Sequence, residues 1–272
     1  MSAISIRPYA VQDRAAVRQI ACDTAFMGGP LRGQYADDES LADILTAHYT
    51  DNEPENALVA EQEGEVIGYL LSCRDARRVT APDLYAFKHV FLRGVCFRPG
   101  TARFYFRSLW DQASRGFLRH IPKIDFDHYP CHTHSNFKPG SRGGGAGTEM
   151  FYRLFDHYKL QGVRGMHALV METNTKTLRW AERKLGYRLH GEPFVVPGMR
   201  DPDGKHMRIQ MILRELDEWE PGAWRVPVRG LPRAPESLRQ LIAAASERSR
   251  GDEDTGPRPV STRPHRERSG SA

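Results

Sequence analysis

Arg142-Gly143-Gly144-Gly145-Ala146-Gly147-Thr148 is the stretch of sequence that decides the fold. It stands between a run that predicts a strand, ending near Phe137, and a run that predicts a helix. Glycines leave main-chain N–H groups uncovered, and the start of a helix adds partial positive charge. The stretch therefore predicts a binding site for phosphate or pyrophosphate.

Two common phosphate-binding motifs do not fit these glycines. A P-loop needs Gly-Lys-Ser/Thr after the glycines, but no lysine lies between Lys138 and Lys159. A dinucleotide-binding motif that begins at Gly145 needs a further glycine where Met150 stands. A glycine-rich turn without a ligand is the plain alternative, because short motifs of this kind are loose.

The spacing that does fit is Arg/Gln-x-x-Gly-x-Gly, filled by Arg142, Gly145 and Gly147. This pattern resembles the acyl-CoA pyrophosphate loop of the GNAT superfamily of N-acetyltransferases. Three further stretches resemble a first strand, a third strand and a helix end of that superfamily: Ser5-Ile6-Arg7-Pro8, Val66-Ile67-Gly68-Tyr69 and Leu185-Gly186-Tyr187. The resemblance spans residues 4–215, and residues 129–134 are most similar to a bacterial subset related to the acetyltransferase-like domain of O-GlcNAcases.

Strand and helix patterns alternate through residues 1–224. Strands are expected at residues 4–6, 57–61, 66–72, 167–171, 194–196 and 207–213 and before Phe137, with a hairpin turn at Glu63-Gly64. Helices are expected at residues 17–24, 40–49, 150–158 and 178–185. This order argues for a mixed α/β fold. The resemblance implies a GNAT-like, mostly antiparallel central sheet flanked by helices.

Residues 225–272 are expected to form a tail separate from the domain of residues 1–224. The tail lacks Phe, Tyr and Trp, and its ten arginines and six acidic residues account for +4 of the net charge of +5. Such a composition cannot offset its ordering entropy, so the tail is expected to be largely disordered, with a short helix at residues 236–248. The folded part is nearly neutral, so nucleic-acid binding is not expected there. A tether for an anionic polymer is a separate hypothesis for the tail.

The chain reads as a cytoplasmic protein without a metal. No apolar run approaches the roughly 20 residues of a membrane span, and residues 1–7 lack a secretory pattern. The cysteines form no CxxC pair, which argues against a disulfide framework and a cysteine zinc site. Zinc at His128, Cys131, His132 and His134 is a weaker alternative, because neighbouring residues of a strand point to opposite faces.

An aromatic-rich insertion is expected at residues 75–129. Between Tyr85 and Tyr129 lie eleven of the chain's 26 aromatic residues. Core packing is the ordinary explanation. The alternatives are a lid or pocket wall for an apolar acceptor, or a subunit interface in a homodimer.

The resemblance implies direct transfer of an acetyl group from acetyl-CoA, as co-substrate, to a primary amine of a small molecule or peptide. It places Phe137 and Lys138 at the pantetheine arm through main-chain groups, and Asn174 beside that arm. The pyrophosphate would be wrapped by Arg142, Gly143, Gly144, Gly145, Ala146, Gly147 and Thr148.

Candidate catalytic groups follow from the strand before the loop. His132, His134 and Asn136 alternate and so share one face. His134 is the preferred base and His132 the second, with a structural role for both as the alternative. Where the family often carries a tyrosine as general acid, this chain has Glu182; Glu172 and Tyr187 are possible substitutes. This departure leaves open a non-catalytic acyl-CoA-binding or regulatory protein with the same fold.

Overall fold

The computed structural model describes residues 3–26, 28–31, 34–79, 88–89, 93–115 and 121–222 of the 272-residue chain. The chain divides into two units, Met1–Arg233 and Ala234–Ala272, and the described residues all belong to the first. The expectations for the tail, residues 225–272, and for Tyr85, Phe87, Phe91 and Phe117 lie outside the described residues. Among the described helices, none combines the length and apolar character needed to cross a membrane.

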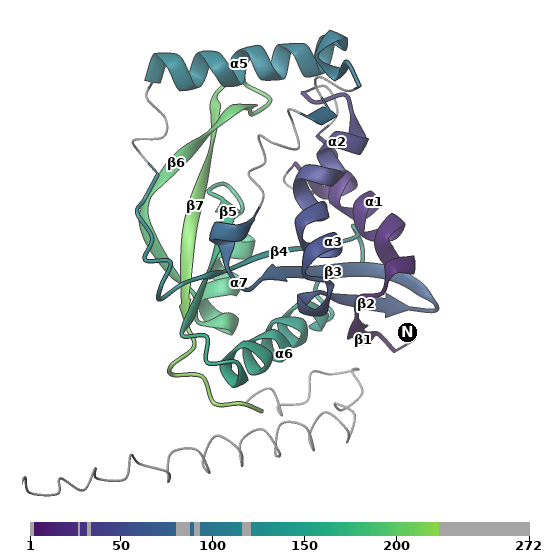
Figure 1. Cartoon of the computed structure of the whole chain (residues 1–272), viewed down its shortest axis with the longest axis vertical. Helices are drawn as coiled ribbons and strands as arrows, with labels where there is room; N and C mark the ends of the chain where they lie inside the picture. Colours follow the sequence, from purple (N-terminus) through teal and green to yellow (C-terminus); the bar gives the residue numbers. More distant parts are fainter. Residues whose placement is uncertain are drawn as a thin grey trace, which may run out of the picture. The chain divides into compact units, whose positions relative to one another are not determined.

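Within the described residues, seven strands form one sheet (Figure 1). The strands are β1 (Ser5–Pro8), β2 (Leu58–Gln62), β3 (Glu65–Cys73), β4 (Cys131–Phe137), β5 (Gly165–Met171), β6 (Arg188–Arg200) and β7 (His206–Glu215). Their order is β1-β2-β3-β4-β5-β7-β6, and all neighbours are antiparallel except β4 and β5. This sheet confirms the predicted mixed, mostly antiparallel α/β fold.

Within the described residues, the helices agree with the expected periodicity wherever a helix was predicted. They are α1 (Arg14–Thr24), α2 (Asp38–Ala42), α3 (His48–Asn52), α5 (Pro99–Arg115), α6 (Ala146–Leu160) and α7 (Thr175–Leu185). A π-helical turn at Asp43–Ala47 joins α2 to α3, and these three segments cover the expected helix at 40–49. Short 3₁₀ turns lie at Val11–Asp13, Pro54–Asn56, Ala76–Arg78 and Val95–Phe97.

The sheet is covered on both faces by apolar helix surfaces. On one face, Val17 and Ile20 of α1 and Tyr49 of α3 belong to one buried cluster with Tyr69 and Leu71 of β3. The opposite face is covered by the buried side chains of α6 and α7, chiefly Met150, Leu154, Phe155, Ala181 and Leu185. The expected apolar stripes of these helices are therefore the sheet-facing stripes.

Some aromatic side chains of the insertion pack against the rest of the domain, and others are exposed. Helix α5 lies across the ends of β6 and β7 at the top of Figure 1. The rings of Phe104 and Tyr105 lie 5.3 and 6.0 Å from that of Tyr35, which confirms core packing for this part. Phe106 and Trp110, in contrast, are 69% and 65% exposed.

A buried ion pair between Asp111 and Arg200 connects α5 to β6. Asp111, 1% exposed, accepts two hydrogen bonds of 2.7 Å from the Arg200 guanidinium of β6. The main-chain N–H of Gly198 donates to the same carboxylate at 2.9 Å. Such a desolvated, multiply bonded ion pair holds the helix in one orientation on the strand.

Candidate active site

The glycine stretch forms an open loop between β4 and α6. Gly143 and Gly145 have φ of +92° and +85°, a left-handed conformation that favours glycine. Gly145 precedes the first helical residue and offers no side chain to cap the helix. In the described part of the chain, no acceptor faces the main-chain N–H groups of residues 142–148. Seven adjacent donors therefore stand at the start of a 15-residue helix, an arrangement whose partial positive charge favours an anion.

Arg142 holds the loop against its neighbours. Its guanidinium donates to the main-chain carbonyl of Phe137 at 3.1 and 3.2 Å and to that of Gly28 at 3.2 Å. A Cβ on Gly28 would lie 2.6 Å from this guanidinium, so a glycine is needed for the close approach. Carbonyl oxygens do not neutralise a cation, so the charge of Arg142 remains available to a phosphate.

The parallel strands β4 and β5 diverge beside this loop. Their pairing ends at Thr133 and Ala168, although β4 continues to Phe137 and β5 to Met171. The N–H of Lys138 donates to the carbonyl of Ile67 on β3 at 2.8 Å. Alternation along an antiparallel pair then directs the N–H of Phe137 away from β3 and into the gap.

The gap belongs to a cavity of about 660 Å³. It is lined by both diverging strands, by α7 and by residues of α3 and the turn before it. Its titratable lining residues are His48, Tyr49, His132, His134, His167 and Tyr187. The cavity thus brings the two predicted histidines and the predicted Tyr187 to one space beside the glycine loop.

His132 stands between a tyrosine and a second histidine. Its Nδ1 lies 2.8 Å from the Tyr49 hydroxyl, and its ring lies 5.1 Å from that of His167. Burial, with smaller contributions from His167 and His134, lowers the pKa of His132 to about 3. At neutral pH this imidazole is uncharged and has one nitrogen lone pair.

His134 belongs to a polar cluster with its neighbours on the sheet. The Asn136 amide lies 3.3 Å from its Nε2 and donates to the Tyr69 hydroxyl at 3.0 Å. Burial lowers the pKa of His134 to about 4. His132, His134 and Asn136 share one face of β4, as the alternation predicts.

His167 is a site residue that the sequence reasoning missed. It lies on β5 directly beside His132, and its Nδ1 is 3.0 Å from the carbonyl oxygen of Tyr129. A carbonyl oxygen only accepts, so the proton of the neutral ring is on Nδ1 and Nε2 keeps its lone pair. Burial lowers the pKa of His167. Its one sequence signal was a histidine within an otherwise apolar strand.

The two candidate acids differ in position. Tyr187 is 3% exposed, its hydroxyl donates to the Met166 sulfur at 3.2 Å, and burial raises its pKa, so it stays protonated at neutral pH. Glu172 is absent from the cavity lining and lies 3.6 Å from Arg208. Glu182 is exposed on α7 and also absent from that lining.

Two predicted cofactor contacts have partners within the protein. The N–H of Lys138 is bonded to Ile67 and its carbonyl accepts from the N–H of Ser141 at 3.1 Å, while its ammonium pairs with Glu65 at 2.5 Å. The side-chain oxygen of Asn174 caps α7 by accepting from the N–H of Thr177 at 3.2 Å. Asn174 nevertheless lines the cavity.

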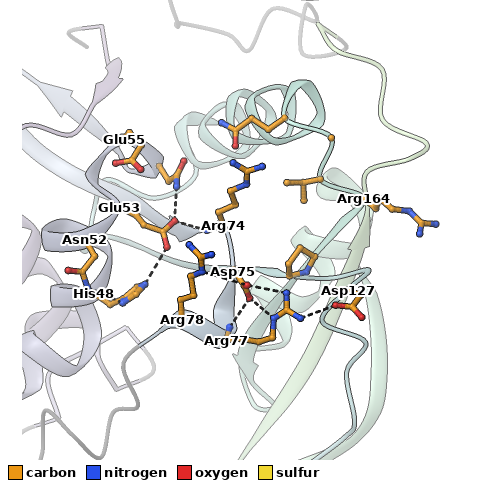
Figure 2. Close-up of a pocket in the computed structure, with 15 residues that line it drawn as sticks. His48, Asn52, Glu53, Glu55, Arg74, Asp75, Arg77, Arg78, Asp127 and Arg164 are labelled. Carbon is orange, nitrogen blue, oxygen red and sulfur yellow. Dashed lines mark hydrogen bonds and ion pairs between the residues drawn. The ribbon is translucent and has the colours of Figure 1, made fainter. Parts of the chain in front are cut away.

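A second cavity, of about 890 Å³, lies at the opposite end of β4 and α6 from the glycine loop. Its walls carry ion pairs: Figure 2 shows Arg77 between Asp75 and Asp127, at 2.9 and 2.8 Å. Glu53 accepts from the Arg74 N–H at 2.8 Å and lies 3.5 Å from the His48 ring. This charged space is chemically unlike the cavity beside the glycine loop.

Comparison with known proteins agrees with this architecture. No protein-family model matches the chain. The crystal structure of SsHAT is similar over 79% of this chain and 98% of that chain, with a TM-score of 0.55 and 22% identity. The structure of yncA, a putative acetyltransferase from Salmonella typhimurium with its cofactor acetyl-CoA, covers 81% of this chain and 99% of its own at a TM-score of 0.47 and 17% identity. The chain therefore shares its fold with SsHAT, and its strand order agrees with the GNAT-like, mostly antiparallel sheet expected from the sequence.

Proposed function

We propose that this chain transfers an acetyl group from acetyl-CoA to a primary amine by direct attack of the amine on the thioester. The observation that carries the proposal is the run of N–H groups at residues 142–148, which have no acceptor among the described residues and lie beside the gap between β4 and β5. A diphosphate satisfies such donors, and an extended arm can enter such a gap from the same side.

The cofactor would be bound mainly by main-chain groups. The N–H groups of residues 143–148 would hold the pyrophosphate, with a charge-assisted contact from Arg142. The N–H of Phe137 and the amide of Asn174 would bond the pantetheine arm. Lys138 is proposed to orient the loop rather than to contact the cofactor, because its main-chain N–H and carbonyl already bond to Ile67 of β3 and to Ser141 of the turn.

The chemistry needs few side chains. The amine nitrogen attacks the thioester carbon, the C–S bond breaks, and one proton passes from nitrogen to the departing sulfur. His134 is the proposed base, directly or through water, with His132 second; a positioned base contributes about 10²–10⁴-fold. Tyr187 is the preferred acid, because it is protonated at neutral pH and is one of the residues that line the cavity, whereas Glu172 is not.

Residues 1–224 form the proposed catalytic domain, and residues 225–272 are proposed to be dispensable for it. Deleting the tail should leave acetyl transfer unchanged. Retention on RNA or DNA measured before and after the deletion would test the separate hypothesis of a polymer tether.

A non-catalytic acyl-CoA-binding protein is the second candidate. This candidate is favoured by Glu182, an exposed residue that occupies the position where the family often carries the tyrosine that acts as general acid. Thiol release from acetyl-CoA over a panel of amines separates the two candidates. Turnover with any amine, confirmed by the mass gain of one acetyl group, rejects the non-catalytic protein; acetyl-CoA binding without turnover across the panel rejects the enzyme.

A further inference from the structure

The cavity beside the glycine loop has an uncharged wall. Of the described residues that line it, none is an aspartate, glutamate, lysine or arginine. The lining is instead apolar over much of its area, with side chains such as Ile44, Leu45, Phe126, Val196 and Met199. Its polar groups are histidines, tyrosines and neutral amides and hydroxyls.

His132, His134 and His167 are uncharged at neutral pH. Burial lowers the pKa of His132 and His134 to about 3 and about 4, and lowers that of His167. A carboxylate does lie behind His48, since Glu53 is 3.5 Å from its Nε2. That carboxylate faces the second cavity, where the Asn56 amide and the Arg74 N–H donate to it (Figure 2).

An alkylammonium ion would therefore lose its hydration in this cavity without meeting a counter-ion among the described lining residues. Burial of an unpaired ammonium is among the most costly transfers in a protein, whereas a neutral amine loses only its hydrogen bonds to water. The second cavity offers the contrast, because charged side chains of both signs line it: Glu53, Glu55, Asp75 and Asp127, together with Arg74, Arg77, Arg78 and Arg164. Among the described lining residues, only the second cavity has carboxylates that could pair with an ammonium.

We propose that the acceptor is an uncharged, weakly basic amine on an apolar body, such as an aromatic amine, and that the cavity lined by His132, His134 and His167 excludes alkylammonium ions. This inference rests on the proposed acetyl transfer and names its acceptor class.

The chemistry of a neutral acceptor agrees with weakly basic histidines. The amine enters with its lone pair free, so no proton leaves before the N–C bond forms. Attack on the thioester makes the nitrogen acidic, and a neutral imidazole then accepts that proton. The C–S bond breaks, and the proton ends on the thiolate sulfur, so no proton is released to solvent.

Two isomeric amines test the proposal with the full-length protein. 4-Ethylaniline and 2-phenylethylamine have the same atoms and similar apolar surface, but only the second is an ammonium ion at pH 7. An amine with the basicity of lysine is neutral in about one molecule in 10³ at that pH. We therefore expect kcat/KM for 4-ethylaniline to exceed that for 2-phenylethylamine at least about tenfold at pH 7, although the alkylamine is the stronger nucleophile.

Two other results would contradict the acceptor class or the proposed function itself. Acetylation of 2-phenylethylamine as fast as its isomer, or of neither isomer, overturns the acceptor class while acetyl-CoA binding leaves the proposed cofactor site intact. Failure of acetyl-CoA to bind removes the proposed function itself.

A variant with a carboxylate in the cavity lining provides a second test of charge exclusion. Ile44 lines the cavity and is partly exposed, so a polar end can be accommodated there. Ile44→Glu should shift the preference toward 2-phenylethylamine by about tenfold or more, since a buried counter-ion favours the ammonium. The isosteric control Ile44→Gln should leave the preference unchanged. Equal preferences in the two variants would argue against charge exclusion.

Discussion

His132 and His167 are paired across the parallel strands β4 and β5, with ring centroids 5.1 Å apart, one residue pair before the strands diverge. The Tyr49 hydroxyl contacts one ring at 2.8 Å, and the Tyr129 carbonyl fixes the tautomer of the other. Two neutral imidazoles thus stand at the inner end of the gap that opens toward the glycine loop. Each can accept a proton there, and neither brings a charge into the cavity before it does so.

The proposed base is tested by His134→Gln. Glutamine retains a hydrogen-bonding side chain but cannot accept a proton at neutral pH. We expect kcat to fall by about 10²–10⁴-fold, the usual contribution of a general base. The Kd for acetyl-CoA, measured on the same sample, should remain unchanged. An unaltered kcat would assign the proton transfer to His132 or His167.

The cofactor loop is tested by Gly147→Val. A Cβ at this position would already lie 3.4 Å from the Phe137 ring and 3.6 Å from Trp180, so further methyl groups extend into the proposed phosphate path. We expect the Kd for acetyl-CoA to rise at least about tenfold, the equivalent of about 1.4 kcal/mol. Gly64→Asn is the glycine control, because at this β2–β3 turn a Cβ meets nothing within 4 Å and asparagine tolerates the φ of +80°; it should bind normally.

Close packing between β3 and the end of β4 is tested by Gly68→Ala. A Cβ there would lie 2.3 Å from the Phe137 ring. Overpacking of this kind costs about 1–3 kcal/mol and should displace the start of the loop. We expect a lower Tm together with weaker acetyl-CoA binding. Phe137→Leu in the same chain should restore part of both, and absence of any rescue would show that this ring does not position the loop.

The buried histidines predict how stability depends on pH. In the folded state the pKa values of His132 and His134 are about 3 and about 4, below the ordinary value of about 6.5 in the unfolded chain. Between these values the unfolded chain binds more protons, so this stabilisation is complete above pH 6.5 and is lost as the pH falls toward 4.

The measurement is Tm against pH from 7 to 4. Each pH unit across that window costs up to about 1.4 kcal/mol per histidine, and roughly 2–4 °C per kcal/mol is expected for a chain of this size. The double variant His132→Gln and His134→Gln should have a flatter profile. Identical slopes in the variant and the parent would place the acid sensitivity in other groups.

The elements with clear periodicity could be predicted from the sequence. The glycine loop, the helix that follows it and the turn at Glu63-Gly64 are where they were expected, and both turn residues have positive φ, at 53° and 80°. In these places a local pattern is sufficient, because turn chemistry and one apolar stripe determine the conformation.

Other elements could not be predicted, for identifiable reasons. Helix α5 begins at Pro99-Gly100, which reads as a turn, and its exposed Phe106 and Trp110 interrupt the expected polar face. Strand β6 is much longer than the three residues expected, because glycine, proline and two register shifts hide its alternation. The pairing of His167 with His132 depends on strand order, which no local pattern encodes.

The most direct test is a calorimetric titration of acetyl-CoA into the full-length protein. The account predicts saturable binding of one cofactor per chain, weakened at least about tenfold in Gly147→Val and retained in Gly64→Asn. No heat of binding at millimolar acetyl-CoA, or equal affinity in the parent and Gly147→Val, would contradict the assignment of the glycine loop as the cofactor site.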